Sequence, residues 1–289
     1  MAQPCWGIAV RLAMILTAMF LAGAALAGPL EDGKAARKRG DYETALQLLR
    51  PLADQGLAGA QNTLAYMYDL GQGVSQDYAE ALKWYRLAAD QGYSLAQNNV
   101  GTMYDKGHGV PQDYAEALKW YRLAADQGDA KAQFNLGVMY ADGRGLPQDY
   151  NEAMKWYRKA ADQAEALAQN NLGRMYDNGR GVSQDYAEAV KWYRLAADQG
   201  YSRAQNNLGK MYDKGRGLPQ DYNEAVNWYR KAADQGNAHA QTNIGFMYET
   251  GHGVPQDYVQ AHMWLSLADH SSLPPKRRKL MSPRVVWKV

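Results

Sequence analysis

The chain has 289 residues, of which 46% are hydrophobic and 21% charged, so it is neither disordered in bulk nor embedded in a membrane. Its 32 lysines and arginines and 30 aspartates and glutamates give a net charge of +2, but the charge is unevenly placed. The last 14 residues hold six basic residues and no acid, so residues 28–275 are mildly acidic. An acidic body argues against nucleic acid as the main ligand.

Residues 1–27 differ from the rest of the chain. Arg11 is their only charge, and an apolar run from Leu12 to Leu26 leads into Ala25-Leu26-Ala27. This pattern predicts a secretory signal peptide cleaved after Ala27, and therefore a periplasmic or secreted protein without a stable membrane span after cleavage. An uncleaved anchor is the alternative, although the run is shorter than the about 20 residues that a span needs. The single cysteine, Cys5, lies in this segment, so we expect no thiol or disulfide chemistry in the mature chain.

A tyrosine of a Gln-Asp-Tyr triplet then recurs every 36 residues. The copies are Tyr78, Tyr114, Tyr150, Tyr186, Tyr222 and Tyr258, and Tyr42 continues the series upstream. A fixed period in this range indicates an array of stacked supersecondary units instead of one globular core. Such arrays usually present an extended surface to another macromolecule.

Each unit predicts a pair of helices, as residues 57–92 illustrate. In the first helix Ala60, Leu64, Met67 and Tyr68 share one face, and a Gly-x-Gly connector ends it. Asp77 is the expected N-cap of the second helix, with Glu80 completing a capping box. The apolar stripe of the second helix comprises Tyr78, Ala81, Leu82, Tyr85, Ala88 and Ala89. A helical pair cannot bury these stripes alone, so neighbouring units must stack.

Small residues and aromatic residues also keep fixed places in the repeat. A mid-helix glycine costs about 1 kcal/mol relative to alanine, so its recurrence predicts close helix crossing under an aromatic ring. These glycines are Gly101, Gly137, Gly173, Gly209 and Gly245. The tryptophan of each second helix, such as Trp156, is expected at a core position. Ala164 stands where most other units close with glycine, and we expect backbone strain there.

These residues resemble the Sel-1-like repeat family, a relative of the tetratricopeptide repeats. The resemblance is clear in Ala-Gln-Asn-Asn-Leu-Gly-Arg-Met-Tyr at 168–176, Gly-Arg-Gly-Val at 179–182 and Trp-Tyr-Arg-Leu-Ala-Ala at 192–197. It implies an all-α fold, a right-handed α/α superhelix (solenoid) of about six 36-residue helical hairpins that binds proteins or peptides. Bacterial members are often exported and act in envelope signalling, localisation or host interaction.

The expected organisation follows from this register. A signal peptide (1–27) precedes a shortened N-terminal repeat (28–56), in which Pro51 should kink or restart the second helix. The six repeats then occupy 57–92, 93–128, 129–164, 165–200, 201–236 and 237–272. A basic C-terminal tail (273–289) stands where the resemblance implies a polar capping helix.

The residues that vary most between copies define the candidate binding stripe. They recur at i, i+4 and i+8 of the first helices, on a face expected to lie opposite the core. The candidate partner-binding residues are Tyr66, Thr102, Phe134, Val138, Arg174, Lys210 and Phe246. Two interpretations stay open: a peptide groove, apolar near Phe134 and cationic near Arg174, or a solvated face that is free to vary.

Two further ladders recur along the chain. The connectors carry Gln72, His108, Arg144, Arg180, Arg216 and His252, interpreted as solvated loop tips unless they meet an acidic partner. The first helices carry glutamines at 97, 133, 169, 205 and 241, and asparagines at 99, 135, 171, 207 and 243. These amides are expected to hydrogen-bond a neighbouring helix instead of a ligand.

We therefore expect a non-enzymatic scaffold with no cofactor or metal that binds a protein or peptide. No Gly-x-Ser-x-Gly, Ser-x-x-Lys or His-Glu-x-x-His motif occurs, and no two histidines stand four residues apart. One alternative is a cell-wall or β-lactam-acting protein, because cysteine-rich relatives are linked to β-lactam binding. That branch carries cysteines in its repeats, which this chain lacks. The other alternative is a rigid spacer, and the oligomeric state stays open.

Overall fold

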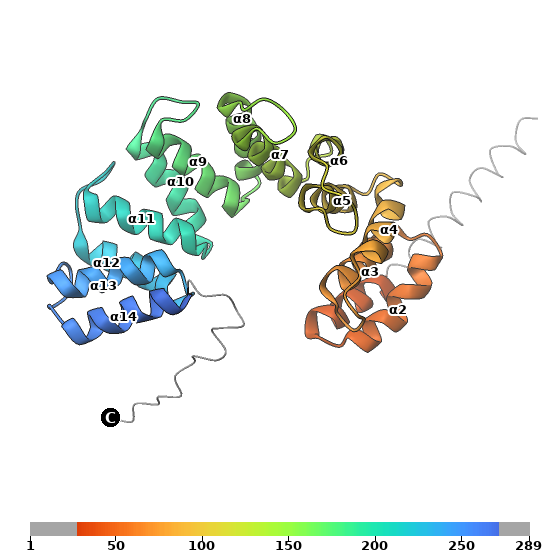
Figure 1. Ribbon diagram of the computed structural model, residues 1–289, viewed down its shortest axis with the longest axis horizontal. Helices are drawn as coiled ribbons and strands as arrows, with labels where there is room; N and C mark the ends of the chain where they lie inside the picture. Colours follow the sequence, from red (N-terminus) through yellow and green to blue (C-terminus); the bar gives the residue numbers. More distant parts are fainter. Residues whose placement is uncertain (1–27, 272–289) are drawn as a thin grey trace, which may run out of the picture. The chain divides into compact units, whose positions relative to one another are not determined.

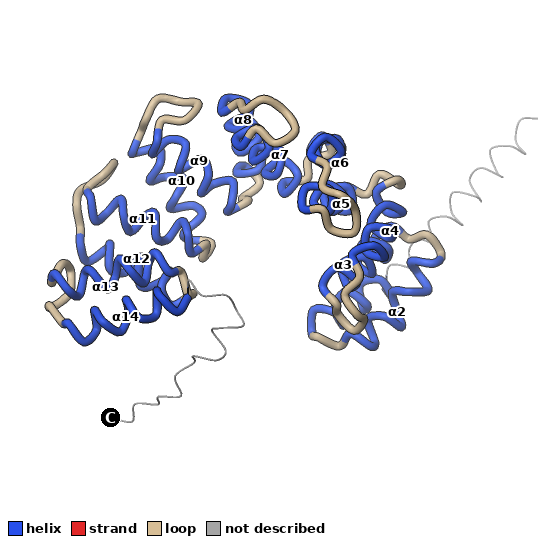
Figure 2. Tube along the Cα trace, in the orientation of Figure 1, coloured by secondary structure: helices blue, strands red, loops and turns tan. Residues whose placement is uncertain are grey.

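The computed structural model describes residues 28–271, and every regular element in that range is an α-helix (Figures 1 and 2). A leading helix covers residues 28–39. The following helices are α2 (Tyr42–Asp54), α3 (Ala58–Leu70), α4 (Tyr78–Ala89), α5 (Ser94–Lys106), α6 (Tyr114–Asp126), α7 (Ala130–Asp142), α8 (Tyr150–Asp162), α9 (Ala166–Asn178), α10 (Tyr186–Asp198), α11 (Ser202–Lys214), α12 (Tyr222–Asp234), α13 (Ala238–Thr250) and α14 (Tyr258–Ser271). The predicted signal peptide and basic tail lie outside the described residues.

The chain divides into two compact units, with the boundary between Ala132 and Gln133 inside α7. In the first unit α2 packs on α3, α3 on α4, α4 on α5 and α5 on α6. In the second unit the same order of neighbours runs from α8 to α14. Within each unit these helices contact the next helix along the chain, as stacked hairpins require. The predicted helical-repeat solenoid is confirmed, with about seven repeats when the leading unit is counted, and the handedness of the superhelix stays a prediction.

Aspartate N-caps begin the second helices as predicted. The Asp77 carboxylate accepts from the backbone N–H groups of Ala79 and Glu80 at 2.9 and 3.0 Å. The capping box is not closed, however. The Glu80 carboxylate accepts from the indole of Trp84 at 2.8 Å, while the Asp77 N–H donates to the carbonyl of Tyr68 at 3.0 Å. A carbonyl of the first helix has taken the role expected of the glutamate, which leaves the glutamate free to orient the tryptophan.

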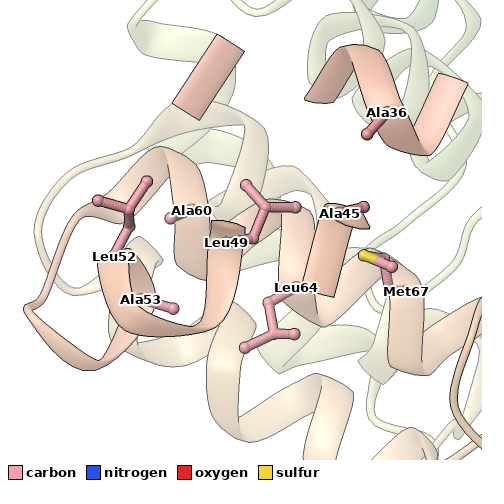
Figure 3. Packing of buried hydrophobic residues seen from close by; sticks show 8 residues of the cluster. All are labelled: Ala36, Ala45, Leu49, Leu52, Ala53, Ala60, Leu64 and Met67. Atoms are coloured by element: carbon pink, nitrogen blue, oxygen red, sulfur yellow. The ribbon is translucent and has the colours of Figure 1, made fainter. Parts of the chain in front are cut away.

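The core follows the predicted apolar stripes. Figure 3 shows its first cluster, in which Leu49 from α2 and Leu64 and Met67 from α3 are fully buried among alanines. In later repeats a tyrosine fills the centre, and Tyr157 is only 3% exposed. Trp156, expected at a core position, is only partly buried. The tyrosine beside it faces inward, and the tryptophans lie at the edge of the cores, as Trp192 does against the cluster around Tyr157.

The mid-helix glycines allow the predicted close approach, and tyrosine is the ring involved. A Cβ added at Gly173 would lie 2.5 Å from Cδ1 of Tyr193, and one at Gly101 would lie 2.7 Å from Cδ1 of Tyr121. Only glycine fits under a ring at that distance without displacement. In the last repeat Leu265 replaces the tyrosine over Gly245.

Glycine has a second role in the connectors. Gly107 ends α5 in the left-handed conformation, as predicted. Gly109, two residues later, also has a positive φ of 71°, and a Cβ there would lie 2.5 Å from the carbonyl oxygen of Tyr78. In the Gly-x-Gly pattern the first glycine therefore ends the helix, and the second allows a close backbone contact with the preceding repeat.

Pro51 neither breaks nor restarts its helix, because α2 continues through it to Asp54. The proline lies in the last turn, where its missing N–H removes one hydrogen bond near the helix end. The expectation of a restart was therefore wrong.

Candidate binding surface on the first helices

In the first unit, the candidate residues Tyr66 and Thr102 lie on α3 and α5. The Tyr66 ring is 37% exposed and lies under the guanidinium of Arg37, with 4.8 Å between the guanidinium carbon and the ring centroid. It lines a groove of about 260 Å³. The Thr102 hydroxyl donates to the carbonyl of Asn98 at 3.0 Å and accepts from the Tyr121 hydroxyl at 3.2 Å. Thr102 lines a smaller groove of about 160 Å³, so the two residues belong to separate hollows.

In the second unit the structure groups the other five candidates into two main grooves. Phe134 and Val138 on α7 and Arg174 on α9 line one groove of about 350 Å³. Lys210 on α11 and Phe246 on α13 line another of about 540 Å³. Arg174 and Lys210 also share a third, polar groove of about 640 Å³. The predicted stripe is therefore a row of grooves, and its use by a partner stays a prediction.

Part of the candidate stripe is buried in helix packing. This is shown by the asparagines that occupy the position of Phe134 in other repeats. Asn98, Asn170 and Asn206 are buried, with at most 5% of each side chain exposed. The Asn207 amide donates to Oδ1 of Asn170 at 3.0 Å, and Asn243 donates to Asn206 at 2.9 Å. The expectation of an exposed face at this register was wrong, because adjacent first helices pack against each other there as well as against second helices.

The predicted glutamine ladder is a stacking device. The Gln97 amide donates to the carbonyl of Ala89 at 3.2 Å, which ties the first helix to the preceding second helix. Gln127, at the end of α6, donates to Oε1 of Gln97 at 2.7 Å. The pair Gln199 and Gln169 repeats the same bond at 2.7 Å. The interpretation of these amides as helix-to-helix contacts is confirmed, so they are engaged in stacking.

Several connector residues lie against tyrosine rings. His108 stacks on the ring of Tyr78 at 4.3 Å between centroids, and His252 stacks on Tyr222 at 4.5 Å. Arg216 lies over the ring of the equivalent Tyr186 at 5.4 Å. Arg216 and His252 are exposed, so the interpretation as solvated positions holds for them, and the ring contact is an additional feature. A planar or cationic residue 30 positions after each Gln-Asp-Tyr tyrosine was visible in the sequence and is the signal that indicates this stacking.

The family model of the Sel1 repeat matches nearly the whole described chain. It assigns seven copies, at residues 18–57, 58–93, 94–129, 130–165, 166–201, 202–237 and 238–268. The chain belongs to the Sel1 repeat family. Members of this family are typically scaffolds for protein–protein interaction and are generally not catalysts. The first copy covers the segment expected to be a shortened repeat.

Solved structures of other Sel1 proteins resemble this one. A Sel1 repeat protein from Oxalobacter formigenes is 35% identical, with a TM-score of 0.76 over 86% of this chain and 99% of that chain. A protective antigen of uropathogenic Escherichia coli strains with an SLR fold is 41% identical, with a TM-score of 0.71 over 79% of this chain. This chain spans about half of the antigen, 49% of its length. A comparison with curated proteins found no match.

The sequence did not predict one set of repeated hydrogen bonds in this Sel1 chain. In four of the Trp-Tyr-Arg motifs the arginine donates to the hydroxyl of a tyrosine 18 residues later, in the next repeat. The Arg158–Tyr176 and Arg230–Tyr248 bonds both measure 2.8 Å. Arg and Tyr are common at both positions in the sequence, but the pairing depends on how one repeat stacks on the next.

The titratable groups of the Sel1 repeats support packing more than chemistry. Burial raises the pKa of Tyr193 far above its ordinary value, and the nearby Asp177 carboxylate adds to the effect. Burial likewise raises the pKa of Tyr85 and Tyr229. These phenols are therefore neutral hydrogen-bonding groups at physiological pH and not nucleophiles. Among residues 28–271, no group of three histidines, cysteines or acids is arranged to hold a metal ion.

None of the helices in the described range is long and apolar enough to cross a membrane.

Proposed function

We propose that this protein is an exported, non-catalytic scaffold that binds a protein or peptide segment in grooves along its first helices. The proposal rests on a difference between the invariant and the variable positions of the repeat. Glutamines that recur in every copy are used in stacking, as the Gln97 and Gln169 amides are. Residues that change from copy to copy, such as Phe134, Arg174 and Lys210, line the grooves.

Export is proposed from the N-terminal segment. The apolar run that ends in Ala25-Leu26-Ala27 supports cleavage before Gly28. The 41% identical relative is described as a protective antigen, a class of protein that the immune system must meet, and we extend that exposure to this chain. N-terminal sequencing of periplasmic or secreted material should begin at Gly28. A mature protein that still carries Met1 would contradict soluble export and favour the anchor.

Affinity capture from an envelope fraction tests the binding role. The matched variant replaces Tyr66, Arg174, Lys210 and Phe246 with threonine, the residue that the chain itself places at the equivalent Thr102. Because threonine already occurs at this position, the variant should fold. A protein captured by the wild type and lost by the variant supports the proposal. Equal capture by both would place the binding site elsewhere and refute the first-helix face.

A labelled β-lactam tests the non-catalytic part of the proposal. The cysteine-rich branch that suggests such an activity differs from this chain, whose only cysteine is Cys5. We expect no covalent label on the purified protein. Stoichiometric labelling that competes with unlabelled β-lactam would overturn the scaffold assignment in favour of an enzyme or a drug-binding protein.

A further inference from the structure

The groove between α7 and α9 differs from its counterparts in chemical character. Phe134 stands where the five other repeats have Asn62, Asn98, Asn170, Asn206 and Thr242. Ala141 stands where they have Asp69, Asp105, Asp177, Asp213 and Glu249. Both changes replace a polar side chain with an apolar one, in the same repeat. Both residues line the same groove, together with Val138.

Phe134 gives up a hydrogen bond that its counterparts make. In the next two repeat junctions, Asn170 and Asn206 accept from the asparagine 37 residues later. The equivalent donor for Phe134 is Asn171, which hydrogen-bonds the Tyr157 side chain instead. The Phe134 ring packs on Tyr157 with 5.8 Å between centroids. At this junction the asparagine–asparagine hydrogen bond is thus replaced by an aromatic contact between two residues that line the groove.

Three arginines contribute to the lining of this groove. Arg174 on α9, Arg180 in the connector after α9 and Arg203 on α11 all line it. Within the described part of the chain, none of the three forms an ion pair with a carboxylate. Asp142 is the only acid among the described lining residues, and it pairs with Arg144 at 2.8 Å. The groove therefore combines the apolar Phe134, Val138 and Ala141 with three arginines that form no ion pair among the described residues.

The neighbouring groove, which Lys210 and Phe246 line, has mixed charge. Its lining includes Asp177 and Asp213, and the Asp213 carboxylate pairs with Lys214 at 3.1 Å. Carboxylates at this register lie close to the cations of the same groove and offset their field. Ala141 removes that carboxylate from the α7–α9 groove alone among the six repeats. The carboxylate of this register is therefore absent from the α7–α9 groove, where Asp142 is the one acid among the described lining residues and the cations are Arg174, Arg180 and Arg203.

From this combination we infer that the α7–α9 groove recognises an acidic peptide segment, with one apolar side chain inserted against Phe134, Val138 and Ala141 and flanking carboxylates bound by Arg174, Arg180 and Arg203. The inference rests on the proposed function and names its ligand chemistry. A volume of about 350 Å³ suits one or two side chains instead of a folded domain. Arginine is the residue best shaped for carboxylates, which it binds through two parallel hydrogen bonds.

Fluorescence anisotropy with a synthetic probe tests the inference. The probe is a fluorescein-labelled peptide of one phenylalanine flanked on each side by two glutamates, titrated with protein purified after expression of the full-length chain. We expect saturable binding with a Kd below about 1 mM, weakened by added salt. Replacing the glutamates with lysines, or the phenylalanine with alanine, should weaken binding at least about tenfold.

The repeats supply variants that should keep the fold. Ala141→Asp and Phe134→Asn introduce residues that other copies already carry at these positions. Each substitution should raise the Kd of the probe at least about tenfold. Asp213→Ala makes the opposite change two repeats away and should leave the Kd within about twofold. Circular dichroism and thermal unfolding verify that the variants are folded.

Three results would overturn the inference: no saturation up to about 1 mM, equal binding of the lysine peptide, or unchanged binding by folded Ala141→Asp protein. The capture experiment separates this failure from a failure of the proposed function. If the wild type captures a partner that the threonine variant loses, while Ala141→Asp protein retains it, the scaffold role stands and this ligand chemistry is wrong. If the threonine variant captures the same proteins as the wild type, the first-helix surface itself is excluded.

Discussion

Replacing Ala164 with glycine should stabilise the protein. Ala164 follows α8 and is the only non-glycine residue with a positive φ within residues 28–271, at 62°. Its N–H donates to the carbonyl of Ala161 at 2.9 Å, and the Glu165 N–H donates to Ala160 at 3.1 Å. These two bonds are those of a Schellman helix end, whose left-handed residue is normally glycine. The equivalent Gly200 has a φ of 87°.

Two opposing effects set the magnitude. An L-residue in the left-handed region costs about 1–2 kcal/mol, which glycine would relieve. Glycine also widens the unfolded ensemble, which costs about 0.4–1 kcal/mol. Packing should contribute little, because a Cβ built at the equivalent Gly128 or Gly200 meets no atom within 4 Å. We therefore expect Ala164→Gly to raise the free energy of unfolding by about 0.5–1 kcal/mol.

Urea unfolding followed by circular dichroism measures this change. The matched control is Gly200→Ala, which creates the same strain one repeat later and should lower the free energy of unfolding by a similar about 0.5–1 kcal/mol. The m-value should stay constant, since neither change alters the buried surface. A lower midpoint for Ala164→Gly, or no loss for Gly200→Ala, would refute the strain argument.

Three further changes test the packing of the repeats. Gly173→Ala should destabilise by up to about 2 kcal/mol in urea unfolding, since overpacking against Tyr193 costs about 1–3 kcal/mol and the gain in helix propensity returns about 1 kcal/mol. A raised midpoint would contradict the close contact. Asn170→Ala should cost about 1–3 kcal/mol because the Asn207 amide loses its acceptor, and the double variant with Asn207→Ala should recover part of that loss. The free energy of unfolding should stay constant below about pH 10, the pKa of tyrosine in the unfolded chain, and fall above it. The reason is that the pKa of Tyr85 and Tyr229 is raised in the folded protein, which keeps protons that the unfolded chain releases. Tyr229→Phe should flatten the fall, and a free energy of unfolding that is independent of pH up to about pH 12 would refute the argument.

The sequence predicted the fold within a repeat because the signals there are local. Asp77 caps α4 and Gly71 ends α3 through bonds that span only a few residues, so their spacing alone indicates the helix boundaries. The mid-helix glycines were also informative, because a repeated cost in helix propensity implies a repeated close contact. The partner ring still had to come from the structure, since Tyr193 and Trp192 are adjacent and only one can face the glycine.

Contacts between repeats were harder to predict. The bonds from Asn207 to Asn170, from Gln127 to Gln97 and from Arg158 to Tyr176 span 37, 30 and 18 residues. These offsets depend on the angle and distance at which one hairpin stacks on the next, which no single helix encodes. The variable stripe was misplaced for the same reason: its Asn170 register looked exposed on an isolated helix but is buried at a helix junction.

Because the repeats share one pattern, a residue that differs from its equivalents in the other repeats can be identified directly. The repeat at 129–164 holds three such residues, namely Phe134, Ala141 and Ala164. Ala164 is exposed at a helix end and lines none of the described grooves, so it shows that a strained departure can persist without any ligand to explain it. One unusual residue is therefore weak evidence for a site. Phe134 and Ala141 are stronger evidence, because independent drift would not be expected to place two apolar changes in one groove that is also lined by three arginines without an ion pair among the described residues.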